Sequence, residues 1–186
     1  TDDLTDYQSA EYASRFRSVV EQSQATERAR GIDSTRYSEA VARNLHKLMA
    51  YKDEYEVARL LLDDAAIEDY RSVGGPRTTI TYHLHPPIMR SLGLHHKLKL
   101  QRSAVPALRV LRASKRLRGT MADPFRWAKV RRVERAMIPE FIDAVATLNR
   151  RLGNDNYDES VEIAALPDRV RGYEDIKLPR AAAYRA

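Results

Sequence analysis

The stretch Leu45–Leu62, LHKLMAYKDEYEVARLLL, constrains the fold more than any other part of this chain. It lies in a run without Gly or Pro that extends from Ile32 up to Gly74, so no local signal ends a helix there. On a helical wheel, one face carries the apolar residues Val41, Leu45, Leu48, Met49, Tyr55 and Leu62. Three charged residues fall in the middle of that same face: Lys52, Glu56 and Arg59. A helix with this pattern must either leave the core at this point or carry a paired network into it.

The periodicity predicts a mainly α fold of four to five helices, two of them long, with a small β-hairpin or strand element near residues 78–100. The run above predicts a helix from Ser34 or Thr35 to Asp64, long enough that we expect a break or a central position. The other predicted helices span Asp3–Arg28, Ala104–Leu117, Pro124–Leu152 and Ser160–Leu166. Thr78–Leu84 is the predicted strand, paired with Lys97–Leu100 or with a sheet edge outside the segment. We expect one domain over residues 1–186, with an irregular tail from about residue 167.

The composition narrows the class of protein. With 43% hydrophobic and 31% charged residues, the chain is typical of a soluble globular protein, and no apolar run approaches the ~20 residues of a membrane helix. It begins TDDLTDYQ, which is not a signal peptide and has no initial Met, so we expect a fragment of a longer polypeptide. The absence of cysteine excludes disulfides, a thiolate nucleophile, iron–sulfur ligation and cysteine zinc sites in this segment, and it fits a cytoplasmic location.

The charged residues Lys52, Glu56 and Arg59 are spaced four and three apart, so their side chains can meet on one helix face. We expect all three to be largely buried in an ion network with opposite charges in reach; the alternative is a surface ladder where the helix leaves the core. Arg126 and Glu134 fall on the apolar stripe of the predicted helix Pro124–Leu152, and they are the partners we expect for a buried network. For all five residues we favour a structural role over catalysis.

Basic residues are concentrated between His95 and Arg135, where thirteen Lys or Arg oppose two acids in a chain of net charge +6. Within this block, Arg109, Arg112 and Arg116 form one row on the predicted helix. The block is compatible with nucleic-acid binding, with phosphate binding aided by the helix start at Asp123, with an acidic domain of the same protein, or with a solvated face. Few aromatic residues lie among these charges, which disfavours a base-stacking surface.

Catalytic and metal sites are not indicated. Four histidines lie within fourteen positions: His83, His85, His95 and His96. No Asp, Glu or Cys between Asp69 and Asp123 completes a metal shell around them, so we expect no metal site. The chain also has no Gly-rich phosphate loop, nucleophile elbow, HExxH or Gly-Asp-Gly metal–diphosphate motif. We therefore expect no catalytic residue in this segment.

Four runs, in this order, carry a resemblance to a known family: AVARNLHKLMAYKDEYEVARLLL, YHLHPP, LRASKRLRGTMADPFRWAKVRRVERAMIPEF and VRGYEDIK. Together they resemble the C-terminal region of the fused indolepyruvate ferredoxin oxidoreductases, in the 2-oxoacid:ferredoxin oxidoreductase group. The resemblance covers nearly the whole chain. The signals LMAYKDEYEVARL and LRGT..DPF..A..RRVERA are long enough to be specific.

The resemblance implies an enzyme that uses thiamine diphosphate, Mg and iron–sulfur clusters, all held outside this segment, to oxidise aryl-2-oxoacids to acyl-CoA, carbon dioxide and reduced ferredoxin. This chain would be its non-catalytic helical accessory domain, packed on the catalytic domains and supporting a homodimer. We then expect an electropositive surface for CoA phosphates or acidic ferredoxin, formed by Arg109, Arg112, Arg116, Arg131 and Arg132. The alternative is a free-standing basic helical domain that binds nucleic acid. A membrane partner is not expected.

Overall fold

The computed structural model describes residues 2–75, 81–84, 98–100, 104–172 and 176–185. The described chain is mainly helical, as predicted, and it groups into two compact units. Unit 1 comprises residues 1–51 and 132–186, and unit 2 comprises residues 52–131. The chain passes between the two units twice, after Tyr51 and after Arg131. The expectation of one domain stays a prediction.

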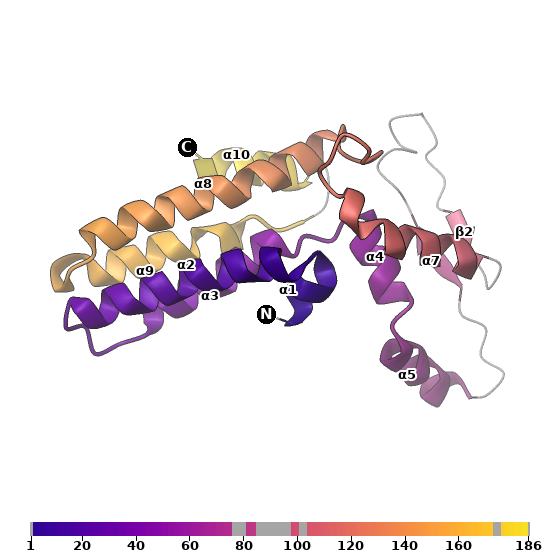
Figure 1. The fold of residues 1–186 in the computed structure, drawn as a ribbon, viewed down its shortest axis with the longest axis horizontal. Helices are drawn as coiled ribbons and strands as arrows, with labels where there is room; N and C mark the ends of the chain where they lie inside the picture. Colours follow the sequence, from indigo (N-terminus) through magenta and orange to yellow (C-terminus); the bar gives the residue numbers. More distant parts are fainter. Residues whose placement is uncertain (1, 76–80, 85–97, 101–103, 173–175, 186) are drawn as a thin grey trace. The chain divides into compact units, whose positions relative to one another are not determined.

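Unit 1 contains the longest described helices, which run alongside one another (Figure 1). Helix α3 packs against both α2 and α9. In chain order the elements are α1 (Asp2–Tyr7), α2 (Ala10–Ala29), α3 (Arg36–Met49), α8 (Lys129–Arg151, in this unit from Arg132), η3 (Asn154–Asn156), α9 (Tyr157–Ala165), η4 (Leu166–Arg169) and α10 (Lys177–Arg185).

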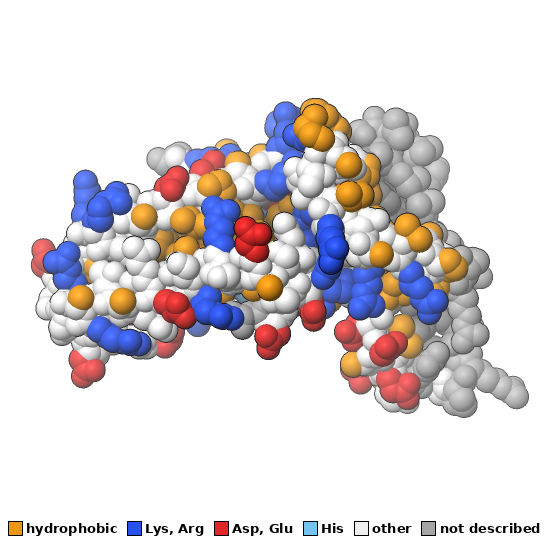
Figure 2. Space-filling view, viewed as in Figure 1, with side chains coloured by type: hydrophobic (Ala, Val, Ile, Leu, Met, Phe, Trp, Pro, Cys, Tyr) orange, Lys and Arg blue, Asp and Glu red, His pale blue; other side chains and the backbone are white. Residues whose placement is uncertain are grey.

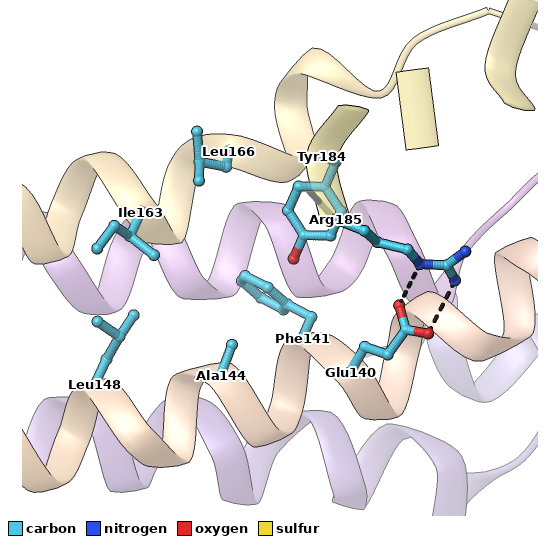
Figure 3. A pocket seen from close by; sticks show the side chains of 8 residues that line it. All are labelled: Glu140, Phe141, Ala144, Leu148, Ile163, Leu166, Tyr184 and Arg185. Atoms are coloured by element: carbon cyan, nitrogen blue, oxygen red, sulfur yellow. Dashed lines mark hydrogen bonds and ion pairs between the residues drawn. The ribbon is translucent and has the colours of Figure 1, made fainter. Parts of the chain in front are cut away.

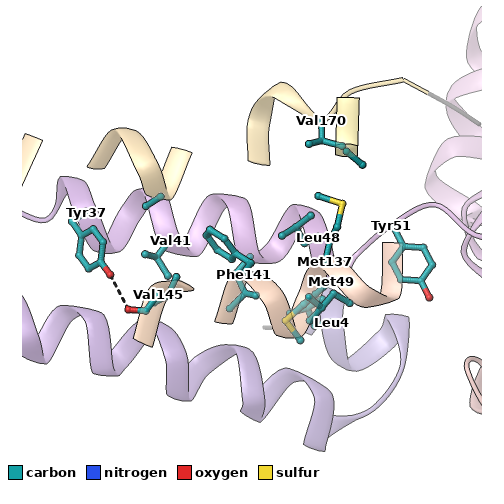
Figure 4. Packing of buried hydrophobic residues seen from close by; sticks show 14 of the residues in the cluster. Leu4, Tyr37, Val41, Leu48, Met49, Tyr51, Met137, Phe141, Val145 and Val170 are labelled. Atoms are coloured by element: carbon teal, nitrogen blue, oxygen red, sulfur yellow. Dashed lines mark hydrogen bonds between the residues drawn. The ribbon is translucent and has the colours of Figure 1, made fainter. Parts of the chain in front are cut away.

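The core of unit 1 is built from apolar stripes at helical spacing. Val41, Leu45 and Met49 of α3 are fully buried, and they belong to one cluster with Phe141 and Val145 of α8 (Figure 4). The spacing of four residues in both helices places these side chains on one face of each helix. Helix α3 therefore occupies the centre of unit 1.

Unit 2 has a much smaller apolar cluster. Its buried members are Ala58, Leu62 and Leu108, and they hold α4 against α7. In chain order the elements are α4 (Glu54–Leu61), α5 (Asp64–Gly74), β1 (Tyr82–Leu84), β2 (Leu98–Leu100), α7 (Val105–Ala113), η2 (Ser114–Leu117) and the first three residues of α8.

The two short strands of unit 2 pair antiparallel. Tyr82 lies opposite Leu100, and Leu84 lies opposite Leu98. Residues 78–80 of the predicted strand and residues 85–97 between the strands lie outside the described part of the chain. His85, His95 and His96 fall there too, so the expectation about a histidine metal site stays a prediction.

The prediction of one helix from Ser34 to Asp64 is wrong, because α3 ends at Met49 and α4 begins at Glu54. Asp53 starts the second helix by accepting a 2.9 Å hydrogen bond from the backbone N–H of Glu56. The first predicted helix is likewise divided at Ser9, whose hydroxyl accepts from the N–H of Tyr12. The prediction of four to five helices is therefore too low for the described residues.

Two boundaries nearer the C-terminus also differ from the prediction. Helix α8 begins at Lys129, not at Pro124. Asp123 does accept a hydrogen bond from the N–H of Phe125, as a cap would, but the residues that follow stay in turns up to α8. The tail predicted to be irregular contains α10, which tolerates Pro179 because a residue in the first helical turn needs no N–H donor.

Candidate functional site

Four consecutive residues around the start of α4, Asp53 to Glu56, are buried although three of them are acidic. Their exposed fractions are 3% for Asp53, 8% for Glu54, 2% for Tyr55 and 6% for Glu56. A carboxylate loses the favourable energy of hydration when it is buried, so it persists only with a charged or hydrogen-bonding partner. All the partners described below lie in unit 2, and we call these contacts the α4 network.

Asp53 pairs with Arg118, and both side chains are 4% exposed. Arg118 donates from Nε and Nη2 to the two carboxylate oxygens, at 2.5 and 2.9 Å, which is the strong bidentate arrangement. The guanidinium also lies 5.5 Å from the centre of the Tyr55 ring. Because Asp53 is at the same time the cap of α4, one carboxylate joins the start of α4 to the residue that follows η2.

The two glutamates of the network also have bidentate partners. Arg131 donates to both oxygens of Glu54, at 3.2 and 3.3 Å, and Arg59 donates to both oxygens of Glu56, at 2.9 and 2.7 Å. Burial raises the pKa of Glu54, and the positive charge of Arg131 opposes that shift. The ion pair with Arg131 therefore offsets part of the cost of burying this carboxyl.

Tyr55 and Asp123 fix the segment between η2 and α8. The Tyr55 hydroxyl donates to Asp123 at 3.0 Å, and the Asp123 carboxylate also accepts from the backbone N–H groups of Gly119 and Phe125, at 2.7 and 2.9 Å. The ring of Phe125 meets that of Tyr55 edge to face, 5.3 Å between centres. Burial raises the pKa of Tyr55, and the Asp123 carboxylate raises it further, so the phenol remains a hydrogen-bond donor. These contacts position the loop between η2 and α8.

The structure brings together only part of the predicted network. Glu56 and Arg59 pair, but Lys52 is exposed, which corrects the expectation that it is buried with them. Arg126 contacts the Met121 sulfur, and its guanidinium lies 4.9 Å from the centre of a Trp127 ring. Glu134 lies in unit 1, where it forms an ion pair with Lys177. Asp53 pairs instead with Arg118, and Glu54 pairs with Arg131.

The five arginines predicted to form one electropositive surface do not all belong to one surface. Arg109, Arg112 and Arg116 are exposed along α7 and η2, in the predicted row. Arg131 is only 8% exposed and pairs with Glu54, so it does not belong to a surface. Arg132 is exposed but belongs to unit 1. Figure 2 shows basic side chains along α7.

Sequence reasoning missed Asp53 and Arg118, the most buried pair of the network. Asp53 followed three residues later by Glu56 is a helix-start signature, and it was the available signal for both the break and the cap. No comparable signal identifies Arg118, which lies 65 residues from its partner.

Glu27 in unit 1 was also missed. It is 2% exposed, and its Oε1 accepts hydrogen bonds from the Tyr157 hydroxyl at 2.8 Å and from the backbone N–H of Tyr37 at 3.2 Å. It therefore satisfies a donor at the start of α3 from a neighbouring helix. Glu27 continues the apolar stripe of α2 at helical spacing from Tyr12 and Phe16, which is the same signal that marks Glu56 and Glu134.

Unit 1 has a surface groove of about 340 Å³. Its lining comes from α8, α9, η4 and α10: Glu140, Phe141, Ala144, Leu148, Ile163, Leu166, Tyr184 and Arg185. At one end Arg185 donates to both oxygens of Glu140, at 2.8 and 2.9 Å (Figure 3). Because the two charges in the lining pair with each other, the groove offers mainly apolar surface.

In the described part of the chain, no group of three or more His, Asp or Glu is arranged to hold a metal ion. No described helix combines the length and the sustained hydropathy of a membrane span. No curated protein and no solved structure matches the chain significantly. The model of a family of unknown function, DUF6537, matches residues 1–186, and the chain therefore belongs to that family.

Proposed function

We propose that this chain is a non-catalytic structural and interaction module of an indolepyruvate-type ferredoxin oxidoreductase. The catalytic domains of that enzyme hold thiamine diphosphate, Mg and the iron–sulfur clusters, and they oxidise an aryl-2-oxoacid to its acyl-CoA. The module packs on those domains and contributes to assembly. The resemblance of the sequence motifs supports the enzyme class, and the contacts between the motifs support the non-catalytic role.

One observation carries the non-catalytic role. The two motifs that are most specific, LMAYKDEYEVARL and LRGT..DPF..A..RRVERA, supply opposite sides of the α4 network. Asp53, Glu54 and Tyr55 come from the first motif, and Arg118, Arg131 and Asp123 come from the second. These motif residues thus stabilise unit 2. That structural role accounts for them without a role in catalysis.

The exposed arginines give the module a second role within the same proposal. Arg109, Arg112 and Arg116 lie on one side of α7 and η2, at the spacing that suits several phosphate or carboxylate contacts. We assign this row to CoA phosphates or to an acidic electron-transfer partner such as ferredoxin. Arg131 is excluded from the row by its burial.

The test uses the complete polypeptide that contains this chain. It should reduce a viologen dye with indolepyruvate and CoA. The variant Arg118→Met should assemble poorly, because a buried carboxylate loses its partner, yet the assembled fraction should keep its KM for indolepyruvate. Reversal of Arg109, Arg112 and Arg116 to Glu should raise the KM for CoA or ferredoxin at low salt.

Two results would contradict the proposal. A complete polypeptide that oxidises no aryl-2-oxoacid would remove the enzyme class. A network variant that assembles with normal mass and stability but has lost the chemical step would make the α4 network part of an active site. As a matched control, Arg15, Arg17 and Arg28, exposed on α2, are reversed to Glu, which changes the net charge equally.

A further inference from the structure

The groove of unit 1 has the dimensions of a small-molecule site. Its volume of about 340 Å³ lies within the usual range of ligand pockets, ~300 to ~1,000 Å³. At ~30 Å³ for each water-sized group, it has room for about eleven non-hydrogen atoms. Glu140, Ala144 and Leu148 recur every four positions along α8, so the groove follows about two helical turns, or ~12 Å. These dimensions suit one compact molecule.

The groove is apolar over most of its length. Its apolar lining comes from α8, α9 and η4: Phe141, Ala144, Leu148, Ile163 and Leu166 (Figure 3). Ile163 is 36% exposed, so part of this apolar surface is in contact with water. A ligand that covers it with an apolar group removes that surface from water, which is favourable. The lining therefore favours a ligand with one large apolar group.

Both signs of charge are accessible at one end of the groove. Arg185 and Glu140 pair there, and their side chains remain 35% and 44% exposed. Arg185 uses Nε and Nη2 for the two hydrogen bonds to Glu140, which leaves other N–H groups of the guanidinium for a ligand. Each oxygen of Glu140 accepts one of these bonds and keeps a further lone pair. The pair can therefore accept an anionic group at Arg185 and a cationic group at Glu140.

Tyr184 adds a hydrogen-bond donor to the groove. Its ring belongs to the lining, and its hydroxyl points into the groove (Figure 3). Burial raises the pKa of Tyr184, and the charge of Glu140 raises it further, so the phenol stays protonated. A protonated phenol can donate to an oxygen of a ligand. Together with the free N–H groups of Arg185, this donor favours a ligand that carries a carboxylate.

We infer that this groove binds a free α-amino acid with a large apolar side chain. The side chain covers the apolar lining, the carboxylate accepts from Arg185 and Tyr184, and the ammonium donates to Glu140. A ligand with one charge meets a like charge in the ion pair as well as an opposite one, whereas a zwitterion supplies the complement of both. A peptide terminus carries only one of these charges at its backbone. The site lies in unit 1 and uses neither the α4 network nor the arginines of α7, so it goes beyond the proposed function.

The first experiment compares ligands that differ in one group. Calorimetric titration of the 186-residue chain should show saturable binding, at a single site, of L-phenylalanine, L-tryptophan or L-leucine. For L-phenylalanine, the N-acetyl derivative lacks the ammonium, the amide lacks the carboxylate, and glycine lacks the apolar side chain. Each of these three compounds should bind at least tenfold more weakly. The inference is overturned if none of the three amino acids binds, or if a blocked derivative binds as tightly as its parent.

The second experiment matches each charge of the pair to its group on the ligand. Glu140→Gln should weaken binding of the amino acid at least tenfold but should not weaken binding of its N-acetyl derivative. Arg185→Met should do the same for the amino acid and leave its amide unaffected. Both side chains are partly exposed, so circular dichroism should show the helix content of the parent. An equal loss for every ligand would show that the pair only shapes the groove, and it would overturn the inference.

A third set of variants locates the site. Ala144→Phe fills the middle of the groove and should abolish binding of every ligand, with the helix content of the parent. As a matched control, Arg36→Met and Asp158→Asn each break another exposed ion pair of unit 1, outside the groove lining, and both should bind like the parent. Binding that survives Ala144→Phe would place the ligand elsewhere and overturn the inference. None of these measurements depends on oxidation of a 2-oxoacid, so a negative result leaves the enzyme assignment to its own test.

Discussion

Different interactions stabilise the interior of each of the two units. Among the described residues, the main apolar cluster of unit 1 contains seventeen buried side chains, whereas the cluster of unit 2 contains three. Unit 2 adds buried ion pairs, Asp53–Arg118 and Glu54–Arg131, in place of apolar side chains. Buried ion pairs contribute little net stability, but they fix geometry and penalise the loss of either partner. Unit 1 thus resembles an ordinary helical core, and unit 2 a small scaffold that positions a loop.

The largest effect should come from breaking an ion pair of unit 2. Arg131→Met leaves Glu54 buried without its partner, and we expect a loss of about 3 to 5 kcal/mol in the free energy of unfolding. The double variant Glu54→Met with Arg131→Met removes both charges, and it should be neutral or stabilising by about 1 to 4 kcal/mol. Urea unfolding, monitored by Trp127 emission, measures the free energy of unfolding of the parent and of each variant. Equal losses for the single and double variants would mean that the pair does not organise unit 2.

The same pair has a defined pH dependence. Burial holds the folded-state pKa of Glu54 above its unfolded value, so the stability that depends on its protonated form is fully present below the unfolded pKa, about 4.3, and is lost as pH rises through the folded pKa. Removing the opposing charge of Arg131 should raise that pKa further. The penalty of Arg131→Met should accordingly be largest near neutral pH and smaller near pH 4. A penalty independent of pH would contradict this account.

A somewhat smaller effect should come from the apolar clusters. Leu45→Ala in unit 1 and Leu108→Ala in unit 2 both remove a side chain that is at most 3% exposed. Such changes cost about 2 to 5 kcal/mol, increasing with the cavity left behind. We expect Leu45 near the upper limit and Leu108 near the lower limit, because the larger cluster surrounds its member more completely. Leu60→Ala, at a side chain 38% exposed, is the matched control and should cost least. The reverse order, measured by urea unfolding and circular dichroism, would reject the contrast between the units.

The smallest effect should come from a surface pair of unit 1. Hydrogen bonds from Arg171 and then from Lys47 hold the pKa of Asp168 below its usual value. A depressed pKa contributes stability that is present above the unfolded pKa, about 3.9, and that is lost as pH falls through the folded pKa. The effect should be slight, because the Asp168 side chain is 48% exposed and solvent screens the charges. Acid titrations of the parent and of Asp168→Asn should separate as pH rises through the folded pKa and differ most above about pH 4; identical curves would show that the pair contributes nothing.

Local patterns in the sequence were sufficient to locate the apolar faces of the long helices. Val41, Leu45 and Met49 are predicted on one apolar face and are buried in α3. An apolar stripe is also predicted for Pro124–Leu152, and α8 buries Met137, Phe141 and Val145. The end of the helical segment before Gly119 was also predictable from the sequence. Gly119 adopts a φ of 76°, a conformation that favours glycine, so the glycine itself marks the end. These features depend on neighbours within one or two helical turns, so periodicity and composition are enough to find them.

The burial of the charges, in contrast, depends on long-range packing. Lys52 and Glu56 share one predicted face, yet Lys52 is exposed and Glu56 is buried, because α3 ends before Asp53 and α4 starts anew. Whether a charge is buried depends on the partner that the fold brings to it, and the partners of Asp53 and Glu54 lie 65 and 77 residues away. A local pattern shows which side of a helix is apolar, but it does not show which arginine will arrive to pair with an acid on that side.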